Sequence, residues 1–582
     1  MFNKASIRLY TKQVAAIKYL FIATLVIGVV TSLVNTIQPL LLKSLFDNIN
    51  SISAYQILVI LGFLLLFTFL SALEGYLQNT IGNKIIANGR RQITRQIQYI
   101  DHESYDNCPK GELISRFTDD VIRISDAIKD GIVSPVSSIF TFCFAFIGMF
   151  LIDKVLLAFS LAFSLLGIVL SVISTKPIDK SSAKVQIANG QLTVTFERFL
   201  SSLPLLRAYN AIPVAANRTE AKITNHYNLM QKITLQESII RPLGGFIMYL
   251  ALFGSVGVGV YRVSSGFTTL GSLVAFVMYL MMMVNPTSQI LGGIAALQAG
   301  KASLLRVNEL LNIKHDTSIS NAIHVKTETV NRPAPGQHAS LSAISFHNVS
   351  YRYECADNSF SLGTLTFDIA RGTKTAIVGQ SGSGKSTILS LIERFRVPAS
   401  GTISLFGIPQ LNYDIDQYRN HFAYIDQEAV ALGGTLRENL LIANNSISKS
   451  MIKDSLAQVG LAYLCERLDV DLGDSGFKLS GGERQRISWA RFLININRDV
   501  LLLDEPTSNV DAISNELLVN ILSKASPSST VLMITHNISQ IKNFDKVLVM
   551  DKGKLLGVGT HETLLEECEK YYYMALNQGV TN

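Results

Sequence analysis

Charged residues are scarce in this 582-residue chain: Asp, Glu, Lys and Arg make up 16% of it, against roughly 25% in an ordinary soluble domain. Apolar residues account for 48%, and the mean hydropathy is positive, at +0.30. This composition argues against an ordinary soluble protein and predicts membrane spans. The chain is also too long for one hydrophobic core, so we expect two or more domains.

Cysteine is also scarce, and the chain has no CxxC motif and no cysteine–histidine cluster, which argues against a disulfide framework and a zinc site. The five cysteines are Cys108, Cys143, Cys355, Cys465 and Cys568. We expect no cleavable signal, because the first apolar run is long enough to span and lacks a small-residue cleavage pattern. The net charge of +7 fits basic cytoplasmic loops better than a nucleic-acid partner.

Apolar runs of membrane length recur up to about residue 300, where a helix needs about 20 apolar residues to cross the bilayer. They are Tyr19–Leu42, Ile57–Leu73, Ile132–Ile152, Val155–Ile173, Leu243–Val260 and Leu270–Val284. We therefore predict an integral membrane protein with six transmembrane helices in a lipid bilayer. Basic residues gather at 84–129 and 176–241, which places both segments and both termini in the cytoplasm. Both segments are too long for loops and are typical of helices that extend beyond the membrane.

The composition changes after the last apolar run, which divides the chain into parts. We predict a transmembrane domain at 1–312, a polar and irregular linker at 313–341, and a second domain at 342–582. In the second domain, short apolar strands alternate with helical patterns. This alternation predicts an α/β fold with mostly parallel strands, fused to the α-helical membrane domain.

The stretch GQSGSGKST fits the phosphate-binding loop pattern G-x-x-x-x-G-K-[ST], and an apolar strand precedes it and a helix follows it. Its glycines let backbone N–H groups close around a phosphate. Lys385 adds a cation for the β- and γ-phosphates, and the Ser386 hydroxyl can ligate Mg²⁺. The predicted nucleotide-binding residues here are Gly379, Gln380, Ser381, Gly382, Ser383, Gly384, Lys385, Ser386 and Thr387.

Carboxylates and a histidine follow two further apolar strands. The run DVLLLDEP ends in Asp504 and Glu505; we predict that Asp504 holds Mg²⁺ through water and that Glu505 orients or deprotonates the attacking water. His536 follows VLMIT, where ligands bind in α/β sheets, and can contact the γ-phosphate and that water. Solvated strand-end acids and a structural histidine are the alternatives.

The turn LSGGE looks like a second phosphate loop without a lysine. Ser480 and Glu483 form a capping box, and Gly481 and Gly482 leave backbone N–H groups bare at a helix N-terminus. Such a turn binds an anion by its backbone and dipole. The alternative is a well-capped helix with no ligand.

From Tyr353 to His536 the order and spacing of these motifs resemble the nucleotide-binding domain of an ABC transporter. The resemblance implies ATP and Mg²⁺ as cofactors, with Tyr353 stacking on adenine and Gln427 in the Mg²⁺ shell sensing the γ-phosphate. It implies that Asp511 links the two domains of a dimer and that LSGGE contacts ATP bound to the other subunit. Glu483 stands where the family most often has glutamine, which would tune ATP affinity or the closing rate.

The membrane half resembles the six-span exporter fold of the same superfamily. His102–Val121 resembles the first cytoplasmic coupling segment, and Arg198–Ala211 the second. The resemblance implies a half-transporter in the plasma (inner) membrane of a bacterium. Intact Lys385, Glu505 and His536 favour a homodimer, and a homologous half-transporter is the alternative partner.

The function that follows is ATP-driven export of amphiphilic compounds, such as drugs, peptides or lipids, by alternating access. An importer of metal–siderophore complexes and an ATP-gated channel or sensor remain alternatives; the spans argue against a soluble ABC ATPase acting on nucleic acid. Substrate clues are few. Glu74 and Gln78 lie at the inner end of the second span. They either mark a functional site or are merely hydrated residues near the membrane boundary. Met281–Met283 offer an adaptable surface, and Asn285 and Pro286 suggest a helix break.

Overall fold

The chain folds into two compact units. The computed structural model describes residues 17–48, 53–313, 342–353, 360–427, 429–444, 446–473, 479–507 and 519–580. The first unit comprises Met1–Thr94 and Gly111–Leu311, and the second comprises Arg95–Lys110 and Asn312–Asn582. The segment Arg95–Lys110 thus belongs with the second unit, although it lies within the helical half of the sequence. Apart from Ile313, the predicted linker lies outside the described residues.

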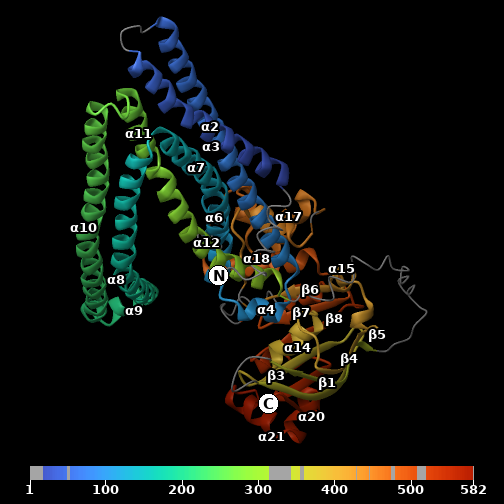
Figure 1. The fold of residues 1–582 in the computed structure, drawn as a ribbon. Helices are drawn as coiled ribbons and strands as arrows, with labels where there is room; N and C mark the ends of the chain where they lie inside the picture. Colours follow the sequence, from blue (N-terminus) through green and yellow to red (C-terminus); the bar gives the residue numbers. More distant parts are fainter. Residues whose placement is uncertain are drawn as a thin grey trace. The chain divides into compact units, whose positions relative to one another are not determined.

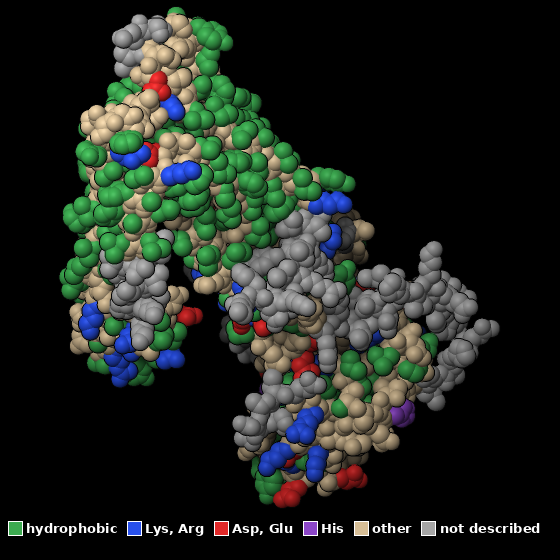
Figure 2. Space-filling view, viewed as in Figure 1, with side chains coloured by type: hydrophobic (Ala, Val, Ile, Leu, Met, Phe, Trp, Pro, Cys, Tyr) green, Lys and Arg blue, Asp and Glu red, His purple; other side chains and the backbone are tan. Residues whose placement is uncertain are grey.

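The first unit is helical, and most of its helices are long (Figure 1). They are α2 (Lys18–Asp47), α3 (Ala54–Tyr99), α7 (Ser134–Ile152), α8 (Lys154–Ser201), α9 (Leu203–Ala208), α10 (Ile212–Ser264), α11 (Leu270–Met282) and α12 (Val284–Leu311). Figure 2 shows apolar side chains covering much of their visible surface. Such a surface suits lipid, because a soluble protein rarely exposes large continuous apolar patches.

Among the described residues, five helices are long and apolar enough to cross a membrane. They are Lys18–Asp47, Ala54–Tyr99, Lys110–Ile152, Ile212–Ser264 and Leu270–Leu311, and they contain five of the six predicted spans. The remaining predicted span, Val155–Ile173, lies on α8. Its described beginning, Lys154–Phe163, is a shorter apolar helix, and several side chains beyond it lie outside the described part.

The helix Lys110–Ile152 contains two π-helical turns. In chain order it consists of α5 (Lys110–Ser115), η2 (Arg116–Asp120), α6 (Val121–Ile128), η3 (Lys129–Val133) and α7. Helix α12 packs closely on it, since a Cβ atom on Gly131 would lie 2.6 Å from Leu297. The Asp120 carboxylate accepts from Arg306 Nη2 at 2.5 Å and Nε at 2.9 Å. This bidentate pair fixes α12 against η2.

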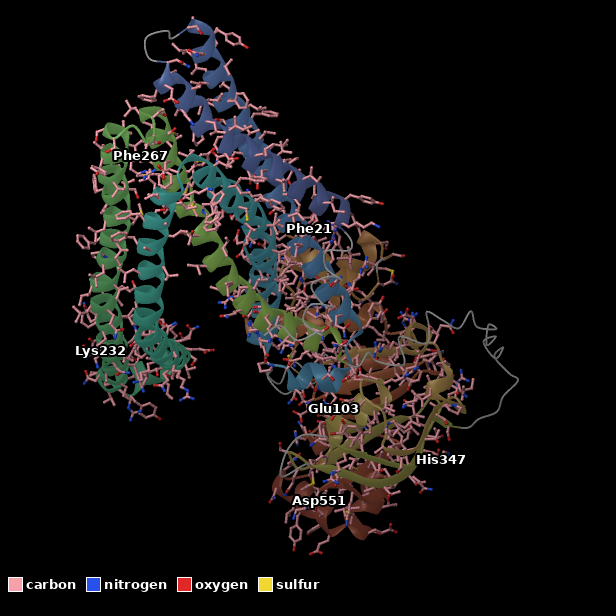
Figure 3. All side chains as sticks on the ribbon, viewed as in Figure 1. Phe21, Glu103, Lys232, Phe267, His347 and Asp551 are labelled. Carbon is pink, nitrogen blue, oxygen red and sulfur yellow. The ribbon has the colours of Figure 1, made fainter. Side chains whose placement is uncertain are left out.

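Helices α8 and α10 lie side by side and are joined by α9 (Figure 1). Asp153 at the start of α8 pairs with Arg262 near the end of α10, with 2.8 Å between Asp153 Oδ2 and Arg262 Nε. The pair lies close to Phe267, which Figure 3 labels. We call residues 181–240 the arm. Ala188 is its one fully buried side chain among those described.

The arm exposes large apolar side chains although its basic residues predict a cytoplasmic position. Phe196, Leu205 and Tyr209 are 49%, 60% and 77% exposed. Figure 2 shows Lys and Arg gathered around α9, and Figure 3 labels Lys232 near that end. Each long helix of the arm buries one strip against the other, so most of its surface stays exposed.

The second unit contains a six-stranded sheet in the order β10–β9–β3–β8–β7–β6 and a four-stranded sheet in the order β2–β1–β4–β5. The strands are β1 (Ser342–Arg352), β2 (Ser361–Ala370), β3 (Lys374–Gly379), β4 (Ser400–Leu405), β5 (Ile408–Pro409), β6 (Phe422–Ile425), β7 (Val500–Asp504), β8 (Thr530–Ile534), β9 (Lys546–Asp551) and β10 (Lys554–Gly559). The larger sheet is parallel except for β10, which confirms the predicted α/β fold. The smaller sheet is antiparallel.

One hydrophobic core fills the space between the two sheets, and another lies under the helices on the opposite face of the larger sheet. The helices of the second unit are α4 (His102–Asn107), α14 (Lys385–Ile392), α15 (Ile415–Arg419), α16 (Leu436–Leu441), α17 (Lys449–Gln458), α18 (Gly481–Ile494), α20 (His561–Glu567) and α21 (Glu569–Asn577). Every residue of β7 is buried, as an apolar strand in a sheet covered on both faces requires. The carboxyl ends of β3, β7 and β8 share one edge, where ligands bind in such sheets.

Candidate functional site

The predicted phosphate loop connects β3 to α14 and needs its glycines. Gly382 and Gly384 have φ angles of +76° and +101°, in the left-handed region that favours glycine. A Cβ atom on Gly379 would lie 2.3 Å from the Met550 carbonyl oxygen. The Ser383 hydroxyl is buried without a hydrogen-bond partner. The backbone therefore curls tightly and leaves a polar group for a ligand, as a phosphate site requires.

Lys385 lies under this loop. Its ammonium group donates to the carbonyl oxygens of Gly379 at 2.9 Å and Gln380 at 3.0 Å, and the side chain is buried. Burial lowers the pKa of Lys385, and the nearby carboxylates of Glu505 and Asp504 oppose that shift. The cation is thus held at the loop by the backbone, with two acidic groups close by.

Asp504 ends β7 next to the start of α14. Burial, followed by the charge of Glu505, raises the pKa of its carboxyl to about 6, while a hydrogen bond from Ser386 and the charge of Lys385 oppose this shift. Its Oδ1 atom is buried without a hydrogen-bond partner. A carboxylate oxygen with no partner beside a hydroxyl fits a hard cation such as Mg²⁺. Gln427 donates to Glu505 through Nε2, which leaves its Oε1 for the same ion.

The structure brings Glu505, His536 and Gln427 together. His536 Nε2 lies 2.5 Å from Glu505 Oε1, and Gln427 Nε2 donates to Glu505 Oε2 at 2.9 Å. Glu505 also adopts a φ of +44°, which is uncommon for a residue with a side chain and marks functional positions. Both oxygens of the predicted catalytic carboxylate are therefore oriented by neighbours from two other elements.

The predicted adenine-stacking residue, Tyr353, lies beside the phosphate loop, with its hydroxyl 3.1 Å from Thr387 Oγ1. The Arg396 guanidinium lies 4.6 Å from the centre of its ring. Arg396 also donates to Asp106 Oδ2 at 2.6 Å and to the Tyr351 hydroxyl at 3.0 Å. It thus links α4, in the predicted first coupling segment, to the tyrosine at the nucleotide site. Sequence analysis missed this residue, since Asp106 and Arg396 are 290 positions apart.

We expect Arg396→Gln to speed amide hydrogen exchange in His102–Asn107 about fivefold, because an ion pair with one exposed partner contributes roughly 1 kcal/mol. Asp106→Asn should have the same effect, and the double variant should add little to either. Exchange measured by mass spectrometry on the full-length protein checks this. Arg437→Gln, which breaks the surface pair with Asp469, is the matched control. Additive effects of the two substitutions would contradict a direct link.

The signature turn begins α18 with the predicted capping box, which is confirmed. Glu483 N donates to Ser480 Oγ at 3.2 Å, and Ser480 N donates to Glu483 Oε2 at 2.8 Å. The Tyr463 hydroxyl donates to Glu483 Oε1. This bond, followed by the Ser480 backbone bond, lowers the pKa of Glu483, so the signature turn carries a negative charge. A Cβ atom on Gly481 would lie 3.9 Å from Arg484 Nη2 and one on Gly482 would lie 3.7 Å from Arg486 Nη2, which are ordinary contacts, and Ser480 is exposed.

Glu483→Gln should leave α18 intact and tighten ATP binding two- to fivefold, because a charge at a helix N-terminus is worth about 0.3–1 kcal/mol. The ATP dependence of hydrolysis checks the affinity. Fluorescence of Trp489, the single and fully buried tryptophan, checks folding. Glu438→Gln alters the equivalent capping box on α16 and should leave ATP dependence unchanged. A lower unfolding midpoint with unchanged ATP dependence would limit Glu483 to a structural role.

One predicted site residue, Asp511, lies outside the described residues. Glu393, the residue that follows α14, could not be predicted from the sequence either and is 7% exposed. Burial, followed by the charge of Asp504, raises the pKa of Glu393 to about 8. This carboxyl is therefore mostly protonated at neutral pH, and no sequence pattern marks it.

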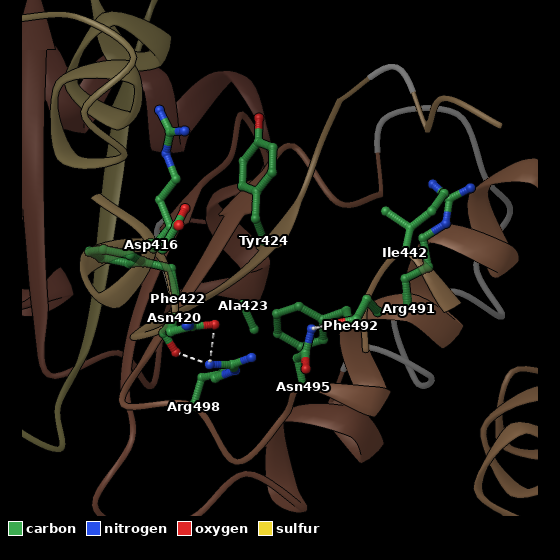
Figure 4. Close-up of a pocket in the computed structure, with 12 residues that line it drawn as sticks. Asp416, Asn420, Phe422, Ala423, Tyr424, Ile442, Arg491, Phe492, Asn495 and Arg498 are labelled. Atoms are coloured by element: carbon green, nitrogen blue, oxygen red, sulfur yellow. Dashed lines mark hydrogen bonds between the residues drawn. The ribbon is translucent and has the colours of Figure 1, made fainter. Parts of the chain in front are cut away.

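A pocket of 490 Å³ elsewhere in the second unit contains none of the predicted site residues (Figure 4). Arginines line it, but their guanidinium groups are engaged by the protein. Arg491 donates to the carbonyl oxygens of Val430 at 2.6 Å and Asn439 at 2.9 Å, and Arg498 donates to the Asn420 carbonyl. The guanidinium groups hold the walls together, and the phosphate loop remains the anion site.

The second unit combines a phosphate loop, a strand that ends in carboxylates and an oriented glutamate. Together with helices of membrane length, these features define a membrane-bound nucleotide hydrolase. Residues 21–287 match the ABC transporter transmembrane region, and residues 362–508 match the ABC transporter family. The chain belongs to the ABC transporters, as a half-transporter of the exporter fold that hydrolyses ATP.

Similar proteins span nearly the same length. A multidrug resistance ABC transporter ATP-binding and permease protein of Lactococcus lactis is 25% identical over 97% of this chain and 94% of its own. An ATP-dependent lipid A-core flippase of Syntrophus aciditrophicus is 27% identical over 86% of this chain and 82% of its own. The fold is similar to a bacterial Atm1-family ABC exporter with ATP bound, with a TM-score of 0.74, 21% identity and 99% coverage of both chains.

Proposed function

We propose that this ABC transporter exports amphiphilic compounds as a dimer by alternating access. The observation that carries the proposal is the site itself. Lys385, Asp504 and Glu505 lie at one sheet edge, and Glu505 is oriented by His536 and Gln427. The chemistry is ATP hydrolysis, with Glu505 activating water and Lys385 facing the phosphates. Mg²⁺ held by Ser386, Gln427 and Asp504 would neutralise charge on the phosphate oxygens.

Two features support a dimer. No hydrogen bond or ion pair joins the signature turn to the phosphate loop among the residues that the structure describes. The arm exposes apolar side chains in a segment that we assign to the cytoplasm. A second copy would supply both a phosphate loop for the signature turn and cover for the arm. The homodimer is favoured because each copy carries its own Lys385, Glu505 and His536, and Asp511 would link the two domains.

The direction and the cargo class are supported by the relatives, whose names describe multidrug resistance and lipid A-core flipping. Both relatives come from bacteria, which supports the plasma (inner) membrane as the location. The basic segments at 84–129 and 176–241 support cytoplasmic termini. Tyr353, beside Thr387 of the phosphate loop, would stack on the adenine, and alternating access would follow from ATP-driven closure of paired nucleotide-binding domains.

A transport assay in inside-out proteoliposomes tests the proposal. ATP should drive uphill accumulation of at least one compound from a panel of drugs, peptides, lipids and ferric siderophores. Glu505→Gln protein is the control for leakage and lipid partition. Accumulation of a ferric siderophore only in right-side-out vesicles would favour an importer. Downhill flux that needs ATP but never becomes uphill would favour a gated channel.

A further inference from the structure

The first unit contains a half-open cavity of 860 Å³ lined by α2, α3, α7, α11 and α12, within the range of drug-sized ligand sites. One side is apolar, with Phe67, Val277, Met278, Met281 and Met282. Unbranched, polarisable methionines adapt to ligands of varied shape. The structure thus brings Met281 and Met282, two of the three methionines singled out in the sequence, to the same cavity as Glu74 and Gln78.

The other side of the cavity is rich in hydroxyl groups whose protons are used within the protein. Thr141 Oγ1 donates to Ser32 Oγ at 2.8 Å, and Ser138 Oγ donates to Gln289 Oε1 at 2.5 Å. Ser32 Oγ donates to the Gly28 carbonyl oxygen at 2.8 Å. The hydroxyl oxygens that remain are acceptors. These hydroxyl oxygens can therefore accept hydrogen bonds from a bound ligand.

Glu74 is the one ionisable residue among those lining the cavity. Its Oε1 accepts from Ser137 Oγ at 2.8 Å and from Gln78 Nε2 at 3.3 Å. These donors are neutral, and no Lys, Arg or His pairs with Glu74 in the described structure. A carboxylate on a membrane-crossing helix is costly without an opposite charge. Its other oxygen, Oε2, remains for a ligand.

The approach of α2 holds Glu74 in place. A Cβ atom on Gly28 would lie 2.1 Å from Ser137 Oγ and 2.9 Å from Glu74 Oε1. Only glycine at this position lets Ser137 reach across from α7 to the carboxylate on α3. The carboxylate is thus built into the packing of three helices, rather than left as a hydrated residue at a helix end.

We propose that this cavity binds monocationic amphiphiles, with the positive group at Glu74 and the apolar body against the methionines. The inference rests on the proposed transport function and narrows its cargo by charge. Pairing with Glu74 is favourable because the carboxylate is partly buried and because no Lys, Arg or His among the described lining residues competes for it. An anion of the same shape meets an uncompensated carboxylate and is rejected.

Tetraphenylphosphonium and tetraphenylborate test this inference, because they share shape and size and differ in the sign of their charge. Equilibrium binding is measured on the full-length protein in nanodiscs without ATP, after subtraction of binding to empty nanodiscs. The wild-type protein should bind the cation at least about tenfold more tightly than the anion, since 1.4 kcal/mol corresponds to tenfold. In Glu74→Gln this ratio should fall to within about threefold, and Glu74→Asp should restore most of it.

Glu237→Gln removes one exposed charge from α10, outside the cavity, and should leave the ratio unchanged. Equal binding of the two ions by the wild-type protein would overturn the inference, whatever the variants do. An unchanged ratio in Glu74→Gln would do the same. Since binding is measured without ATP, charge-selective binding without transport would instead overturn the proposed function.

Discussion

Glu505→Gln should lower ATP hydrolysis by at least about 100-fold, the lower end of what a positioned general base contributes, and should leave ATP binding within about threefold of the wild type. Glutamine has the same shape and can still hydrogen-bond to His536 and Gln427, so the site stays assembled. What the substitution removes is the carboxylate that takes a proton from water. Transport should fall with hydrolysis, because hydrolysis resets the closed dimer.

Single-turnover and steady-state hydrolysis by the full-length protein in proteoliposomes check this expectation, with nucleotide binding measured on the same samples. Glu393→Gln is the matched control. It makes the same chemical change at a second carboxyl near Asp504, but the Glu393 carboxyl is mostly protonated at neutral pH because its pKa is raised to about 8. Its activity should stay close to that of the wild type. Full hydrolysis by Glu505→Gln would remove Glu505 from the mechanism.

The parts of the site that could be predicted from the sequence are those fixed by local geometry. The capping box joins Ser480 to Glu483, three positions apart, which helix geometry alone brings together. Lys385 and Ser386 follow the same logic in a strand–loop–helix unit. Asp504 and Glu505 could be placed because an apolar strand in a covered parallel sheet ends at the edge where ligands bind. In each case, neighbours in the sequence are neighbours in space.

Contacts between distant segments could not be predicted in this way. Arg396 meets Asp106 across 290 positions, and Ser137 meets Glu74 across 63. The sequence left open whether Glu74 belongs to a site or is merely hydrated. Its packing against α2 and α7 favours the site. The antiparallel sheet also escaped prediction, since β1 pairs with β4 across an intervening phosphate loop and helix.

The completion of each ATP site by a second copy can be tested with two inactivating substitutions in defined pairs of subunits. Lys385→Ala disables the phosphate loop. Gly482→Asp places a negative charge where the signature turn would meet a phosphate, and it keeps the capping residues Ser480 and Glu483. An acidic residue in the first turn also favours the helix, and a Cβ atom at this position would make only an ordinary contact, 3.7 Å from Arg486 Nη2, so α18 should still form.

The two placements of these substitutions predict opposite results. If the sites are shared, both substitutions on one subunit beside a wild-type partner damage each site once and leave none intact. One substitution on each subunit damages a single site twice and leaves the other complete. Differently tagged subunits, co-purified as defined pairs, should therefore show at least about tenfold higher ATP hydrolysis in the second arrangement, since loss of phosphate-binding contacts costs more than 1.4 kcal/mol.

If each chain completes its own site, the order reverses, because the wild-type partner then keeps an intact site only in the first arrangement. Pairs of two wild-type subunits and pairs of two double variants set the upper and lower limits of activity. Equal low activity in both arrangements would mean that one ATP site cannot turn over without the other. A tandem fusion of two copies, in which only one site carries Glu505→Gln, then measures how far hydrolysis at one site depends on the other. Higher activity in the first arrangement would contradict the prediction that the signature turn completes the partner's ATP site. The chief reason for proposing a dimer would then be lost.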